Sequence, residues 1–249
     1  FRFSANLTLG ELVNFQFMMA YLSATGVVYV LATFVALIRK KPLTEAAIEA
    51  QCAVIGNVGF LGIPMLALLM GEAAVGHVMM ILAVDLIVFG SLIVMIIVGS
   101  RDGRMSLAIL RTLGIGLVKN PMIVSIVLGL SWSASGVPIP NPLNEFVMIL
   151  GNAATPGALF AIGASLASKS AERVEVAAWL SFCKLVLHPI AIAIAALYVF
   201  DVDPYAAAVM IAAASLPVAG NIYMIEVLQV SLAAVCRIAL APRIVTQEA

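Results

Sequence analysis

The amino-acid sequence predicts an all-α integral membrane protein. Of its 249 residues, 63% are hydrophobic and only 10% are charged, and the mean hydropathy is +1.14. Soluble proteins carry about 25% charged residues, and a globule of this size has too small an interior to hide so many apolar side chains from water. The formal net charge is zero, so no basic surface indicates binding to nucleic acid. We therefore expect the chain to lie in a lipid bilayer.

The predicted membrane spans are apolar runs of about 20 residues, the length that crosses a bilayer as a helix. Seven such runs occur, at about 15–38, 45–70, 76–98, 114–131, 143–167, 174–199 and 205–228. Glycine and proline interrupt two of them, the run at 45–70 in its segment IGNVGFLGIP and the run at 205–228 in its segment SLPVAGN. Because proline removes a backbone donor and glycine weakens a helix, we expect these two helices to be broken.

Charged residues orient the spans. Basic residues fall in alternate connections, namely Arg39, Lys40, Lys41, Arg101, Arg104, Arg111, Lys169 and Arg173. The remaining connections have no Lys or Arg and carry Glu72, His77, Glu145, Asp201 and Asp203. Since basic loops stay on the cytoplasmic side, the pattern predicts a multi-pass protein of the cytoplasmic membrane.

The chain also matches itself weakly at an offset of about 159 residues, which places the two broken helices on each other. Five spans separate the copies, so the copies would have opposite orientations, as in the inverted repeats of many transporters. We expect the remainder of a first repeat at 1–100, a cytoplasmic connection at 101–113, a second repeat at 114–228 and a non-spanning tail at 229–249. The parent would have ten spans, of which seven are present. Chance similarity between apolar runs is the alternative.

Several motifs resemble the auxin efflux carrier family: GNVGFLGIPM (56–65), KNPMIVSIVLGL (119–130), TPGALFAIGASLA (155–167), KLVLHP (184–189) and SLPVAGNIYMI (215–225). Bacterial members of that family are described as permeases for malonate, malate or similar organic anions. The resemblance implies two inverted five-helix repeats whose broken fourth and ninth helices cross, here 45–70 and 205–228. Relative to the family pattern, the first two helices and the tenth are absent, and the segment after residue 225 is atypical. The resemblance to this family also implies that two copies of the protein pair through a scaffold.

The two breaks hold the candidate substrate site. Family members place an asparagine at the position of Asn57 to contact the substrate carboxylate, and Asn221 fits the equivalent place in the second crossing helix. An asparagine amide can donate two hydrogen bonds to a carboxylate without carrying a charge of its own. Gly56 and Gly220 would let the backbones approach closely, and Pro64 and Pro217 mark the breaks. The alternatives are that the amides satisfy freed backbone groups and that the glycines serve packing alone.

Three ionisable residues inside predicted spans are candidates for ion or proton coupling, since such residues are costly in lipid and are functional by default. They are Asp85, Lys184 and His188. Alternatively, Asp85 pairs with a polar neighbour, and the side chain of Lys184 extends to the cytoplasmic surface.

The predicted function is therefore secondary active transport of a small organic anion, such as a mono- or dicarboxylate, by alternating access, with no cofactor and no metal site. Two alternatives stay open. One is a truncated membrane protein that does not transport. The other is an intramembrane enzyme, which would need a nucleophile–base pair or a metal cluster at helical spacing; the two histidines, His77 and His188, are predicted on opposite sides of the membrane.

Overall fold

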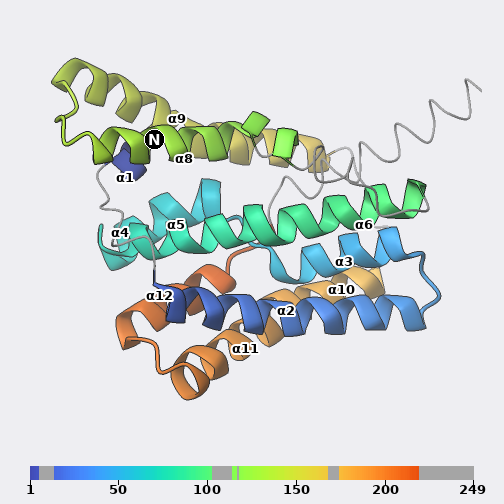
Figure 1. The fold of residues 1–249 in the computed structure, drawn as a ribbon. Coiled ribbons are helices and arrows are strands. Elements are labelled where there is room, and N and C mark those ends of the chain that lie inside the picture. The colour runs from blue at the N-terminus through green and yellow to red at the C-terminus, as the bar shows by residue number, and fades with distance from the viewer. Residues whose placement is uncertain (6–13, 103–113, 117, 168–173, 219–249) are drawn as a thin grey trace, which may run out of the picture.

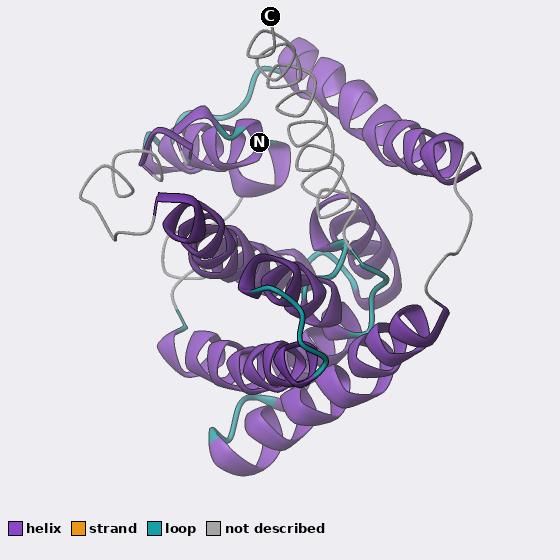
Figure 2. Cartoon of the chain, turned by 90° about the vertical axis from the view of Figure 1, so that its right-hand side faces the viewer, coloured by secondary structure: helices purple, strands orange, loops and turns teal. Residues whose placement is uncertain are grey.

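The computed structural model describes residues 1–5, 14–102, 114–116, 118–167 and 174–218 (Figure 1). Those residues form helices and loops and contain no β-strand (Figure 2). Three helical stretches among them are long and apolar enough to cross a membrane, namely Phe15–Ile38, Ala74–Ser100 and Val174–Val199. Shorter apolar helices lie at Val58–Met70, Pro121–Ala134 and Pro204–Ala214. This architecture confirms the predicted all-α membrane protein.

The first long helix, α2 (Phe15–Ile38), has the bounds that the apolar run predicts. The Asn14 side chain caps it by accepting a hydrogen bond from the backbone N–H of Phe17 at 3.0 Å. One face of α2 is buried and consists mainly of small or aromatic residues at helical spacing: Phe17, Ala20, Tyr21, Ala24, Thr25, Val28, Tyr29, Ala32 and Ala36. Small residues allow helices in a membrane to pack closely, and this face packs against α3 (Leu43–Val54).

The predicted break in the second span is confirmed. Helix α3 ends at Val54, and the chain becomes helical again in the π-turn η2 (Val58–Gly62), which continues into α4 (Ile63–Met70). Gly56 lies in the gap, whereas Pro64 lies after it, in the first turn of α4. Proline is tolerated there because the first turn of a helix needs no N–H from it.

The end of helix α12 meets the break after α3. Helix α12 (Pro204–Ala214) begins after Asp203, whose carboxylate accepts a hydrogen bond from the backbone N–H of Ala206 at 3.1 Å. The chain leaves the helix after Ala214, and Val218 then forms an antiparallel bridge with Gly56. Two segments more than 150 residues apart therefore meet here, at a point that we call the crossing.

Two long helices flank the crossing, and both contain π-turns. The first runs through α5 (Ala74–Val84), η3 (Asp85–Phe89) and α6 (Gly90–Asp102). The second runs through α10 (Val174–Phe182), η4 (Cys183–Leu187), α11 (His188–Ile194) and η5 (Ala195–Val199). In Figure 1, α2 and the helix at 174–199 run in opposite directions through the bundle. This arrangement agrees with an inverted repeat, which stays a prediction.

The region predicted as a single span at 114–131 contains a helix start at Asn120, and its extent as a span stays a prediction. Helical residues at 114–116 and 118–119 are followed by Asn120, whose extended backbone begins a new helix, α8 (Pro121–Ala134). The Asn120 side chain accepts a hydrogen bond from the backbone N–H of Met122 at 2.9 Å. The Asn-Pro pair is a helix-start signal that the apolar pattern conceals.

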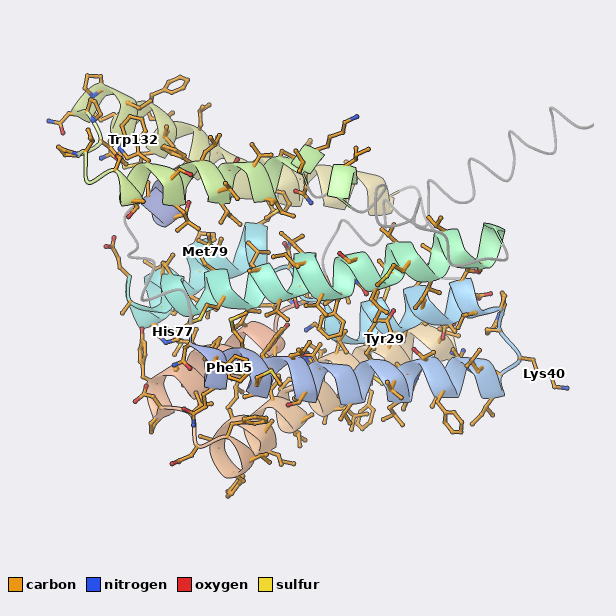
Figure 3. The ribbon with its side chains drawn as sticks, in the orientation of Figure 1. Phe15, Tyr29, Lys40, His77, Met79 and Trp132 are labelled. Atoms are coloured by element: carbon orange, nitrogen blue, oxygen red, sulfur yellow. The ribbon has the colours of Figure 1, made fainter. Side chains whose placement is uncertain are left out.

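Helix α8 and the 27-residue helix α9 (Asn141–Ala167) follow one another in the chain and lie above the crossing bundle in Figure 1. The short helix α1 (Arg2–Ala5) packs against α8. Lys40 and His77 lie at opposite ends of the bundle (Figure 3), as the alternating charges predict. Gly220, Asn221, the tail at 229–249 and most of the connection at 101–113 lie outside the described residues.

Gly56 provides a stability test of the crossing. A Cβ atom at Gly56 would lie 3.3 Å from the Ala213 carbonyl oxygen and 3.3 Å from the Lys184 ammonium nitrogen. Overpacking of this kind costs about 1–3 kcal/mol, so we expect Gly56→Ala to lower the free energy of unfolding measured by titration with a denaturing detergent.

The matched control is Gly26→Ala, because a Cβ at Gly26 in α2 meets no atom within 4 Å. Alanine is favoured over glycine inside a helix, so this variant should be as stable as the wild type or slightly more stable. Equal stability of Gly56→Ala and Gly26→Ala would contradict the tight crossing.

Candidate functional site

The crossing brings together the ends of three helical segments inside the protein. Helices α3 and α12 end there at Val54 and Ala214, and η2 begins there at Val58. The backbone N–H of Asn57 donates a hydrogen bond to the carbonyl oxygen of Pro217 at 2.7 Å. This hydrogen bond provides a partner for a backbone donor in the gap after α3 and for a backbone acceptor after α12.

The side chain of Lys184 binds carbonyl groups at the ends of α3 and α12. This side chain is only 1% exposed, and its ammonium donates to the carbonyl oxygen of Val54 at 3.0 Å and to that of Ala214 at 2.6 Å. A third contact, 3.3 Å long, joins the ammonium to Nδ1 of His188. Lys184 therefore points into the crossing and does not extend to the cytoplasmic surface.

His188 continues the polar network. Its Nε2 lies 3.0 Å from the hydroxyl oxygen of Thr25 in α2. With Nδ1 accepting from Lys184, the network places the single ring proton on Nε2, which then donates to Thr25. The ring of Tyr21 also contacts His188 edge to face, with a centroid separation of 6.0 Å.

Asp85 is the buried acid of the site. It opens the π-turn η3 and is 4% exposed. The Tyr21 hydroxyl donates to its Oδ1 at 2.8 Å, whereas Oδ2 is buried without a hydrogen-bond partner among the described residues. Asp85 also interacts electrostatically with Lys184. Asp85 thus does have the polar neighbour that the sequence left open as an alternative, and half of its carboxylate stays available.

Asn57 occupies the gap between α3 and η2 and is 5% exposed. Its carbonyl oxygen accepts hydrogen bonds from Leu61 and Gly62, at 3.1 and 3.0 Å, which starts the new helix. Its side chain does not cap that helix. The carboxamide therefore stands beside a helix N-terminus, where backbone N–H groups and the helix dipole favour an anion.

The structure thus gathers five of the predicted residues around one crossing: Gly56, Asn57, Asp85, Lys184 and His188. Pro217 joins them through its carbonyl oxygen. Pro64 lies farther along, inside α4. Among the described residues, no group of three or more His, Cys, Asp or Glu side chains is placed to hold a metal ion.

Sequence reasoning missed two residues of this network, Tyr21 and Thr25. They are four residues apart on α2 and therefore share a helix face. At the predicted repeat offset of about 159 residues, Thr25 is the counterpart of Lys184. Tyr29 also carries a hydroxyl on this face, so hydroxyl groups in the apolar run did not single out Tyr21 and Thr25.

Comparison with known proteins shows the family of the chain. The model of a family described as "Membrane transport protein" matches residues 2–229. A "Putative malonate transporter" of Rhizobium meliloti (strain 1021) is 27% identical over 229 residues, which are 90% of this chain and 71% of that protein. Because the family model covers nearly the whole chain, the chain belongs to the membrane transport proteins that include the auxin efflux carriers.

Proposed function

We propose that the chain is a secondary active transporter that moves a small organic anion across the cytoplasmic membrane by alternating access. The observation that carries the proposal is the meeting of the break after α3 with the chain that leaves α12, at Gly56 and Val218. In transporters built this way, helix N-termini at the breaks face anionic groups of the substrate, and carbonyl groups at the helix C-termini face cations. Membership of a transport family favours this function over an intramembrane enzyme or a non-transporting membrane protein.

The substrate carboxylate would bind at Asn57 and the N-terminus of η2. Asn57 supplies an uncharged donor beside backbone N–H groups, and the small Gly56 lets the second chain segment approach. Asn221 and Gly220 would complete the site from the second crossing element. Malonate is the first substrate to test, because a relative bears its name.

The moving part would be the crossing bundle, and the scaffold would include α8 and α9. Gly59 in η2 packs against the methyl group of Met122 in α8, so the two parts touch next to the proposed site. We propose that the bundle slides against α8 at this contact. Pairing of two copies through the scaffold stays a prediction.

Asp85 is the residue that we assign to proton or cation coupling. Its Oδ2 atom is buried and has no hydrogen-bond partner among the described residues, so a proton or a cation would complete its environment. Tyr21 from α2 and Lys184 from η4 are the titratable groups that interact with it. Exchange of this proton or cation would couple an ion gradient to transport.

The first functional prediction concerns Asn57→Ala. Hydrogen bonds to a charged group are worth about 1.5–3 kcal/mol, so losing the amide should weaken the apparent affinity for substrate about ten- to a hundredfold. The measurement is uptake of labelled malonate, malate and indole-acetate into proteoliposomes that contain the chain.

Asn152→Ala is the matched control, because Asn152 is an exposed residue of α9. It should transport like the wild type. Uptake that is unchanged in Asn57→Ala would remove Asn57 from the substrate site, and the absence of saturable uptake of all three anions by the wild type would contradict transport of carboxylates.

The second functional prediction concerns Asp85→Asn, which keeps the shape of the side chain but removes its charge. We expect this variant to exchange external for internal substrate at a rate near that of the wild type. It should lose accumulation driven by a proton or cation gradient, because the coupling group no longer changes its charge.

Asp201→Asn provides the control, since Asp201 is exposed and asparagine tolerates its positive φ of 48°. This variant should keep gradient-driven accumulation. If Asp85→Asn accumulates substrate like the wild type, Asp85 is not the coupling residue.

A further inference from the structure

Two helix C-termini converge on one buried ammonium group. The last residues of α3 and α12, Val54 and Ala214, both direct their carbonyl oxygens to Lys184. The C-terminus of a helix carries about half a negative charge, so the two ends together carry about one. The single positive charge of Lys184 balances them at the point where they meet.

The hydrogen bonds of Lys184 also decide what it does not bind. An ammonium group has three protons and no acceptor, and all three directions are occupied by Val54, Ala214 and Nδ1 of His188. Gly56 leaves no extra room, because a Cβ there would lie 3.3 Å from the ammonium nitrogen. Lys184 thus has no donor left for a substrate carboxylate.

A position lined by carbonyl oxygens at two helix ends is where a transporter of this architecture would bind a metal cation. Here a side chain from a third helix, in the π-turn η4, fills it. Lys184 is 1% exposed, so water does not compete for these carbonyl groups.

We propose that Lys184 is a built-in cation that holds the ends of α3 and α12 together, so that the crossing needs no metal ion from solution. Lys184 is then a positioning residue: it orients Asn57 and the start of η2 through the crossing. The effect on transport rests on the proposed function, whereas the effect on stability does not. In Asp85→Asn, which removes the proposed coupling site, we expect stability and substrate exchange to be the same in sodium, potassium and choline chloride.

The test compares two variants by thermal unfolding in detergent and by substrate exchange in proteoliposomes. Lys184→Ala removes the ammonium and leaves its space empty, and Lys184→Met fills the space without a charge. Both lower thermal stability and reduce exchange by about tenfold or more, as expected for the loss of charge-assisted hydrogen bonds.

Added cations separate the two variants. Methylammonium ions occupy the space that the ammonium leaves in Lys184→Ala and restore its thermal stability saturably, whereas Lys184→Met does not respond to them. Lys41→Ala is the control, because Lys41 forms an ion pair with Glu45 near the surface, 3.1 Å long. This control keeps stability and exchange and shows no response to the added cations.

Three results would overturn the proposal: wild-type stability in Lys184→Ala, equal rescue of both variants, or saturable stabilisation of Asp85→Asn by sodium. The last measurement leaves Lys184 unchanged, so it applies even if both substitutions of Lys184 prevent folding. If added methylammonium restores the stability of Lys184→Ala but even the wild type shows no substrate exchange, the built-in cation is supported and the proposed transport function is contradicted.

Discussion

The structure depends on one constraint, that backbone polar groups inside a membrane protein must find partners without help from lipid. Unsatisfied N–H and C=O groups cost several kcal/mol each in hydrocarbon, yet α3 and α12 both end inside the bundle. The structure meets this cost by bringing the two ends together. Asn57 donates to Pro217 across the crossing, and Lys184 takes the carbonyl groups of Val54 and Ala214. The meeting of the ends of α3 and α12, with about 150 residues between them, follows from this requirement.

The crossing has two electrostatic sides, and this asymmetry separates its roles. On one side the ammonium group of Lys184 lies between the two helix C-termini, and three contacts occupy it. On the other side η2 begins with an N-terminus that its own Asn57 side chain does not cap. The proposed anion site lies on this second side, because the ammonium on the first side has no donor left. Tyr21 contacts both Asp85, through its hydroxyl, and His188, through its ring.

The sequence predicted the parts of this arrangement that follow from composition. Apolar run length placed α2 and the helix at 174–199 at their observed bounds, glycine and proline marked the break at Gly56, and the rarity of charge in spans singled out Asp85 and Lys184. The partners of those charges could not be found in this way. Lys184 binds backbone carbonyls, which every residue has, and Tyr21 and Thr25 are polar residues that a membrane span tolerates without a visible signal. The inverted repeat and the place of Asn221 stay predictions.

The π-turns explain how two otherwise apolar helices carry charges toward the same point. Asp85 begins one such turn, and Lys184 lies in another, closed by the N–H of His188 on the carbonyl of Cys183. A π-turn adds one residue to the turn and so rotates the side chains that follow it relative to those before it, and such turns are frequent at functional sites. A rotation of this kind lets the lipid-facing surface of the helix keep its apolar residues while the charged residue faces inward. The wider turn has a weaker hydrogen-bond ladder, so the contacts of Asp85 with Tyr21 and of Lys184 with the crossing stabilise the turns that position them. The π-turns η3 and η4 thus position Asp85 and Lys184, and the contacts of these two residues stabilise the turns.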